Sequence, residues 1–172
     1  FQKLGLLEKI NFELEEIGRP LDFNWEKCKL ETVSYGHGIT TTPLQAASAY
    51  ASITNGGFSI NPTLKLQKES NDTNKQPVIS KTTSNQINKI LRKVVTDKEG
   101  TGSFADIPGY NVGGKTGTAK SYTNVNANIN TFISVFPTEK PKYVLLVILN
   151  DPKAAPHLTY NYRGQIIKNI LR

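Results

Sequence analysis

The sequence is poor in the side chains that join a protein covalently or through metal ions. Its 172 residues include one cysteine, Cys28, two histidines and no methionine. A single cysteine excludes an internal disulfide and a Cys-x-x-Cys zinc site, and we expect Cys28 to be a small side chain of the core. The sequence therefore predicts neither a metal site nor a cofactor. The missing initiator methionine predicts that the chain is part of a longer protein.

Long hydrophobic runs are also absent. The longest extends from Tyr143 to Leu149, which is far too short to cross a bilayer but suits a buried strand. The first sixteen residues contain glutamates and no long apolar core, so they do not form a signal peptide. The aromatic side chains of Trp25 and Tyr35 are expected in the core or at an interface.

Negative charge is scarce in the last third of the chain. The net charge is +7, and residues 111–172 hold eight basic and two acidic residues, whereas residues 1–31 hold five basic and seven acidic. A basic surface suits nucleic acid, an acidic membrane surface, a carboxylate ligand or plain solvation. The lysines are dispersed, and no aromatic-basic motif or zinc finger accompanies them, so we expect no nucleic-acid partner.

Two segments have the pattern of helices. Thr42 can cap a helix that has Pro43 in its first turn and ends at Asn55-Gly56-Gly57. A second helix begins near Ser80 and ends at the glycines 100 and 102. The first helix has a small packing face of Leu44, Ala47 and Ala51. The second has an apolar stripe at helical spacing, formed by Ile87, Ile90, Leu91, Val94 and Val95.

Three strands are predicted after these helices, over residues 111–119, 130–136 and 143–150. Residues 1–34 look rich in loops, with a short helix near residues 1–10, and a last helix is predicted over residues 160–171. Helices followed by an antiparallel three-strand meander and a closing helix indicate an α+β fold.

The first predicted strand carries the sequence Lys115-Thr116-Gly117-Thr118. Alternation along a strand places Thr116 and Thr118 on one face and Lys115 and Gly117 on the other. On an edge strand, free backbone groups beside a glycine would form a template for an extended peptide, and the lysine would favour an anion. The plain alternative is an exposed strand near a turn, and the tripeptide Lys-Thr-Gly alone favours that alternative.

Further segments accompany this strand in a fixed order. Residues 34–57 read SYGHGITTTPLQAASAYASITNGG, residues 115–120 read KTGTAK, and residues 131–152 read TFISVFPTEKPKYVLLVILNDP. Together they resemble the transpeptidase domain of class B penicillin-binding proteins, especially the division-type enzymes that cross-link peptidoglycan. The resemblance covers nearly the whole chain, and it implies the penicillin-binding-protein and serine β-lactamase fold.

The resemblance is incomplete in its active-site motifs. In that family a nucleophilic serine in S-x-x-K, an S-x-N loop and a K-T-G strand form the site. No serine of this chain has a lysine three residues later, and its one S-x-N, Ser59-Ile60-Asn61, follows the helix stop at residues 55–57. We interpret Ser59 as a chance match. Residues 1–172 therefore correspond to the C-terminal portion of a transpeptidase domain, without the part that holds the other two motifs.

The resemblance implies a role for each residue of the K-T-G strand. Lys115 would support the proton network around the serine, Thr116 would bind the terminal carboxylate of the ligand, and Gly117 would let the ligand approach. The backbone N–H of Thr118 would be one of two donors to the oxyanion. The implied partners are the D-Ala-D-Ala stem peptide, β-lactams, the missing N-terminal part and division proteins, and the implied location is the periplasm.

Other functions share some of these features. Carboxypeptidases and β-lactamases also carry a K-T-G strand, although the segments 43–57 and 147–152 favour the transpeptidase. A non-catalytic binding module would keep the strand and lack the nucleophile. The residues encoded before Phe1 discriminate between these alternatives, since an S-x-x-K there indicates the enzyme.

Overall fold

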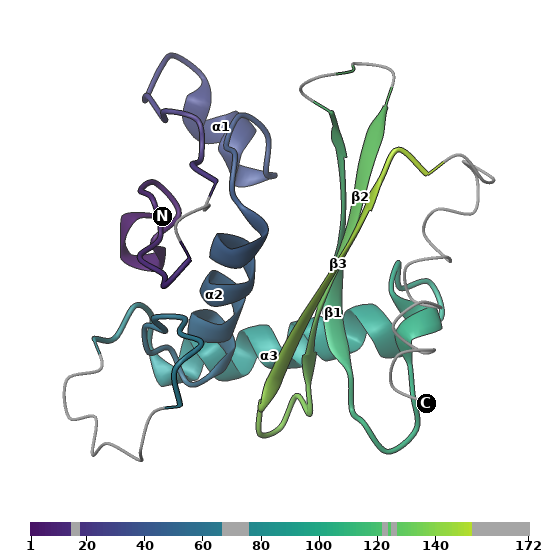
Figure 1. Ribbon diagram of the computed structural model, residues 1–172. Coiled ribbons are helices and arrows are strands. Elements are labelled where there is room, and N and C mark those ends of the chain that lie inside the picture. The colour runs from purple at the N-terminus through teal and green to yellow at the C-terminus, as the bar shows by residue number, and fades with distance from the viewer. Residues whose placement is uncertain (15–17, 67–75, 122–123, 125–126, 153–172) are drawn as a thin grey trace.

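The computed structural model describes residues 1–14, 18–66, 76–121, 124 and 127–152 (Figure 1). Its helices are α1 (Lys29–Ser34), α2 (Pro43–Thr54) and α3 (Lys81–Thr96), with short 3-10 helices at Gln2–Leu4 and Ser103–Ala105. The strands β1 (Gly113–Lys120), β2 (Asn128–Phe136) and β3 (Tyr143–Asn150) form one sheet. The α+β prediction and the three strands are confirmed, while the predicted helix at 160–171 lies outside the described residues.

Helix α2 begins where the sequence predicts, because Thr42 and Gln45 cap it reciprocally. The Gln45 N–H donates to Thr42 Oγ1 at 3.2 Å, and the Thr42 N–H donates to Gln45 Oε1 at 2.9 Å. This capping box satisfies two backbone donors that the first turn leaves without partners. The Gln45 Nε2 also donates to the carbonyls of Gly5 and Glu8 at 3.0 and 2.7 Å, which ties the N-terminal segment to α2.

The buried side of α2 is more polar than predicted. The expected packing residues Leu44, Ala47 and Ala51 are only half-buried, and the deepest positions are Gln45, Ser48, Ala49, Ser52 and Thr54. Polar groups can be buried at low cost when they are hydrogen-bonded. Ser52 Oγ meets this condition by donating to the Ser48 carbonyl at 2.8 Å and accepting the Ile60 N–H at 2.9 Å.

The apolar stripe predicted for α3 is wrong at Ile90, which is 60% exposed. The buried stripe is instead Ser84, Asn88, Leu91 and Val95. Its two polar members contact the C-terminal end of α2, where Ser84 Oγ accepts the Gly56 N–H at 3.0 Å and Asn88 Nδ2 donates to the Thr54 carbonyl at 2.9 Å. The two helices are therefore joined by hydrogen bonds at positions that a hydrophobicity pattern does not mark.

The strands of the described residues form an antiparallel meander in the order β1-β2-β3, so β1 is at one edge of this three-stranded sheet. Phe132 pairs with Thr116 on one side and Val147 on the other. On this face Phe132 and Phe136 form the hydrophobic core with Val95 of α3 and the segment before β1, against which Leu145 and Val147 pack. On the other face of β3, Val144 and Leu146 are half-buried and Ile148 is 40% exposed.

The N-terminal third is looser than predicted. Cys28 is exposed rather than in the core, because the N-terminal segment around it forms almost no core, with Val33 as its one buried hydrophobic residue among the described residues 1–35. Trp25 is 61% and Tyr35 74% exposed, so neither is a core residue of the described chain. Helix α1 was not predicted from the sequence, and the short helix expected near residues 1–10 is a single 3-10 turn. No helix among the described residues has the length and hydrophobicity needed to cross a membrane.

Candidate ligand-binding strand

Strand β1 carries the Lys-Thr-Gly sequence at the edge of the sheet, as expected. Lys115 is exposed, and its Nζ donates to the carbonyl oxygen of the next residue, Thr116, at 2.8 Å. An exposed ammonium on an edge strand can attract an anionic ligand to that edge. Lys115 therefore lies where a charged ligand can reach it.

Thr116 has a different environment from its neighbour. Its side chain is on the opposite face of the strand from that of Lys115, and it is only 8% exposed. Its Oγ1 lies 3.0 Å from the Oγ1 of Thr101, in the turn after α3, and either hydroxyl can be the donor. Because Thr101 is exposed, the Thr116 hydroxyl is directed toward a surface residue.

Thr118 shares the face of Thr116 but has a buried partner. Its Oγ1 donates to Oδ1 of Asn130 at 3.2 Å. Asn130 is directly across the strand pair and is 1% exposed. Sequence reasoning missed both Thr101 and Asn130. The signal for Thr101 was its place between two glycines after a helix, and nothing in the sequence marks Asn130.

Glycines let β1 lie close to its neighbours. A Cβ at Gly114 would be 2.5 Å from the Phe132 ring and 2.7 Å from the Ile133 carbonyl oxygen, and one at Gly113 would be 3.0 Å from the backbone of α3. At Gly117, the Cβ would be 2.5 Å from Thr131 Oγ1. The structure thus adds packing within the domain to the ligand approach that the sequence suggested for Gly117.

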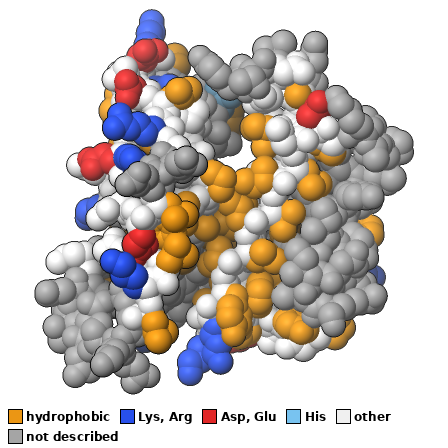
Figure 2. Space-filling model, viewed as in Figure 1, with side chains coloured by type: hydrophobic (Ala, Val, Ile, Leu, Met, Phe, Trp, Pro, Cys, Tyr) orange, Lys and Arg blue, Asp and Glu red, His pale blue; other side chains and the backbone are white. Residues whose placement is uncertain are grey.

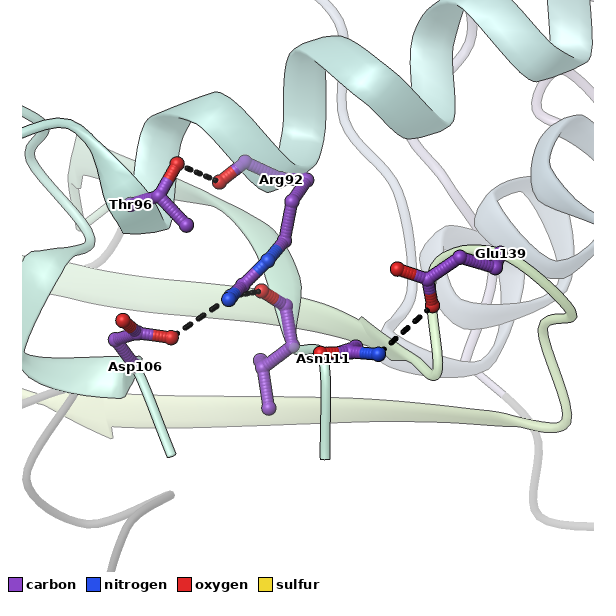
Figure 3. Close-up of polar contacts among 6 residues, drawn as sticks. Arg92, Thr96, Asp106, Asn111 and Glu139 are labelled. Carbon is purple, nitrogen blue, oxygen red and sulfur yellow. Dashed lines mark hydrogen bonds and ion pairs between the residues drawn. The ribbon is translucent and has the colours of Figure 1, made fainter. Parts of the chain in front are cut away.

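The start of β1 is fixed to α3 by Arg92 (Figure 3). Its Nη1 donates to Asp106 Oδ1 at 2.8 Å and to the Val112 carbonyl at 2.7 Å. Nearby, Asn111 Nδ2 donates to Glu139 Oε2 at 3.2 Å. A guanidinium that bridges a carboxylate and a backbone carbonyl restrains both, so the strand enters the sheet at a fixed position.

Ser59 is not brought to this strand. It follows α2, and its N–H donates to the Gln76 carbonyl at 3.0 Å, beside a bridge between Phe58 and Pro77. Figure 1 shows this segment at the far end of α2 from the loop that precedes it, and away from β1. Among the described residues, no group of three or more His, Cys, Asp or Glu side chains is placed to hold a metal ion.

Comparisons with known proteins agree with one another. The family model described as "Penicillin binding protein transpeptidase domain" matches residues 1–172. A probable peptidoglycan D,D-transpeptidase FtsI of Caulobacter vibrioides is 34% identical over 89% of this chain and 28% of its own length. The stage V sporulation protein D of Bacillus subtilis is 32% identical over 98% of this chain and 28% of its own length.

A solved structure shows the same fold. The apo transpeptidase domain of penicillin-binding protein 3 from Burkholderia pseudomallei has a TM-score of 0.89 at 25% identity, over 99% of this chain and 53% of that one. The chain thus spans about half of that solved domain and between a quarter and a third of the two curated relatives.

Proposed function

The chain belongs to the penicillin-binding protein transpeptidase domain family, and from this premise we propose that it is the C-terminal portion of a peptidoglycan D,D-transpeptidase domain. One observation carries the proposal. The family's K-T-G sequence lies on an edge strand, with an exposed lysine and two hydroxyls beside it. Such an edge can bind an extended peptide that ends in a carboxylate.

The proposed reaction is acyl transfer from a D-Ala-D-Ala stem peptide. A serine supplied by the rest of the protein attacks the penultimate D-Ala carbonyl, D-Ala leaves, and an amine of a second stem peptide resolves the acyl-enzyme. β-Lactams acylate the same serine. Lys115 stabilises the proton network around that serine, and Thr116 binds the carboxylate of the ligand. Gly117 keeps the strand narrow enough for the ligand to lie along it.

Thr118 contributes a backbone oxyanion donor in this proposal. The N–H and C=O of one strand residue point in the same direction, and those of alternate residues point the same way. Lys115 Nζ donates to the Thr116 carbonyl, which fits a Thr116 carbonyl that points away from β2. The N–H of Thr118, two residues later, would then point the same way. The hydroxyl of Thr118 plays no part in this step.

The rest of the domain would pack against surfaces that this chain leaves apolar. Figure 2 shows hydrophobic side chains gathered between α2 and β3. One face of β3 is only partly covered, with Ile148 40% exposed, and burial of such a face is favourable. The other half of the domain, with the nucleophile and its lysine base, is the occupant we propose. Peptidoglycan lies outside the cytoplasmic membrane, so the proposed location is extracytoplasmic, with division proteins among the partners.

Labelling with a fluorescent penicillin tests this function. The complete protein that contains this chain should form a covalent adduct, and residues 1–172 alone should form none. Lys115→Ala should slow adduct formation by about a hundredfold or more, the range typical of a lost proton-transfer group. Lys120→Ala is the matched control, since Lys120 is an exposed lysine on the same strand, and it should label like the unaltered protein.

Two results would contradict the proposal. An adduct on Ser59 of the chain alone would show that the nucleophile is present here. A complete protein that binds penicillin without acylation would instead be the non-catalytic binding module.

A further inference from the structure

The proposed ligand strand has two threonine hydroxyls on one face, and their hydrogen bonds differ. A hydroxyl has one proton to donate and two lone pairs that accept. Thr118 uses its proton on Asn130 Oδ1. The Thr116 hydroxyl faces another hydroxyl, that of Thr101, at 3.0 Å, and either can donate. The contact of Thr116 with Thr101 therefore leaves the direction of the Thr116 proton open, whereas the contact of Thr118 with Asn130 fixes the direction of its proton.

We propose that Thr101 is a positioning residue, which donates its proton to Thr116 Oγ1 and so directs the Thr116 proton toward the carboxylate of the ligand. This inference rests on the proposed function, because it assumes a carboxylate ligand at Thr116. When a carboxylate arrives, the Thr116 proton forms a charge-assisted hydrogen bond, which is stronger than one between two neutral hydroxyls. The pair then donates in one direction, from Thr101 to Thr116 to the carboxylate.

The turn that holds Thr101 is built to keep it in place. Within residues 97–105, the Gly100 N–H donates to the Asp97 carbonyl at 2.9 Å and the Gly102 N–H donates to the Val94 carbonyl at 3.2 Å. The Ala105 N–H then donates to the Gly102 carbonyl at 2.9 Å. Hydrogen bonds thus fix the backbone on both sides of Thr101 to the end of α3.

The glycines on either side of Thr101 are needed for this close approach. A Cβ at Gly100 would lie 2.2 Å from the Val94 carbonyl oxygen, and one at Gly102 would lie 3.1 Å from the Phe132 ring. Phe132 pairs directly with Thr116 across the sheet. The same core side chain therefore supports both the turn of Thr101 and the strand of Thr116, and the two hydroxyls meet without a flexible segment between them.

A carboxylate-dependent comparison tests the inference in the complete protein. The rate of acylation is measured with benzylpenicillin and with its methyl ester, in which the carboxylate is masked. Thr101→Val removes the hydroxyl and keeps the shape of the side chain. It should slow acylation by benzylpenicillin about tenfold, the effect of one misdirected hydrogen bond, and should change the rate with the ester much less. Thr101→Ser, which retains the hydroxyl, should react like the unaltered protein.

Further variants separate positioning from folding. Thr96→Val is the matched control, because Thr96 is an exposed threonine whose hydroxyl donates within α3, to the Arg92 carbonyl; both of its rates should stay unchanged. In a Thr116→Val background, Thr101→Val should have no additional effect on benzylpenicillin. Where Thr101→Val lowers the yield of folded protein, Thr101→Ala is measured in its place.

Each other outcome decides the matter. An equal loss with acid and ester, or no loss with the acid, would overturn the role of Thr101. If the unaltered complete protein is not acylated, the proposed reaction fails, and binding of N-acetyl-D-Ala-D-Ala is measured by NMR titration instead. A weaker affinity in Thr101→Val than in Thr101→Ser would then support the inference without the reaction, and equal affinities or no binding would overturn it.

Discussion

The region of the sheet and α3 differs sharply from the first 35 residues in how apolar side chains are used. In the sheet region, Phe132, Val135, Val95 and Val112 have 0–1% exposure. In residues 1–14 and 18–35, Val33 is the one buried hydrophobic residue, and large apolar side chains are exposed by 43–74%: Phe1, Leu14, Leu21, Trp25, Leu30 and Tyr35. The first region buries a core of its own, although one face of β3 stays partly uncovered. The second region has almost no buried core and presents apolar surface that a further part of the protein can cover.

The difference is also visible in what joins each region to the rest. The start of β1 is joined to α3 by Arg92, which donates to the Asp106 carboxylate and to the Val112 carbonyl. Gly113 also lies close to the backbone of α3. The N-terminal segment is joined to α2 by the amide of Gln45 and to residues 63–64 by the carboxylate of Glu13. Stability is therefore expected to be uneven along the chain, with the N-terminal segment opening first.

The largest expected effect is the loss of a core side chain. Phe132→Ala should lower the free energy of unfolding of the 172-residue chain by about 3–5 kcal/mol, through lost burial and the cavity that remains. Leu30→Ala, in the exposed region, should change it by less than about 0.5 kcal/mol. Urea denaturation measures both. In the complete protein, Leu30→Ala should become more costly, and a value that stays near zero would show that nothing covers this surface.

A smaller loss of unfolding free energy is expected when a methyl group is added at a glycine of β1. Gly114→Ala would push a methyl group against the Phe132 ring and the Ile133 carbonyl, and should cost about 1–3 kcal/mol of unfolding free energy. Gly18→Ala is the matched control in the N-terminal region, since among the described residues its Cβ would come nearest to Thr42 Cγ2, at an ordinary contact distance of 3.4 Å. Equal unfolding midpoints for the two variants would contradict the close packing of β1.

The third expected effect concerns the arginine shown in Figure 3. Arg92→Met keeps most of the side chain but leaves the carbonyl of the fully buried Val112 without this donor. The expected cost is about 1–2 kcal/mol, more than an exposed ion pair alone would give. Arg19→Met, in the exposed region, serves as the control and should be nearly neutral. Thermal unfolding followed by circular dichroism would detect the difference, and a neutral Arg92→Met would rule it out.

The smallest effect is a pH dependence in the N-terminal region. The hydroxyl of Thr63, together with the Leu64 N–H, lowers the pKa of the exposed Glu13 carboxyl. A lowered pKa in the folded state means that the carboxylate stabilises the fold above its ordinary pKa, and this contribution is lost as the pH falls through the folded pKa. An NMR titration should give a midpoint below the ordinary value in the chain and a higher one in Thr63→Val. A midpoint that Thr63→Val leaves unchanged would refute this cause.

The sequence was most informative where local chemistry decides the structure. The Thr42 cap, with Pro43 behind it, places the start of α2 correctly, and β3 has the predicted bounds. Prediction was weaker where contacts come from distant segments. Ile90 fits the apolar spacing of α3 but is exposed, while Asn88 is buried because the Thr54 carbonyl, 34 positions earlier, accepts its amide. In the candidate site, the sequence marks residues 115–118 as a prediction, and it marks Thr101 only by the glycines on either side of it. Nothing in the sequence marks Asn130, because only the folded turn and the strand pairing bring Thr101 and Asn130 to this strand.

The glycines of β1 also determine which substitutions in this strand are compatible with the fold. At Gly113 and Gly114 any side chain would meet helix backbone, a strand carbonyl or a core ring, so these positions are closed to variation. Gly117 is open only if Thr131 turns its hydroxyl aside. Variation at this edge is therefore expected at residues other than Gly113 and Gly114, such as Thr101 in the adjacent turn and Thr131 in the paired strand.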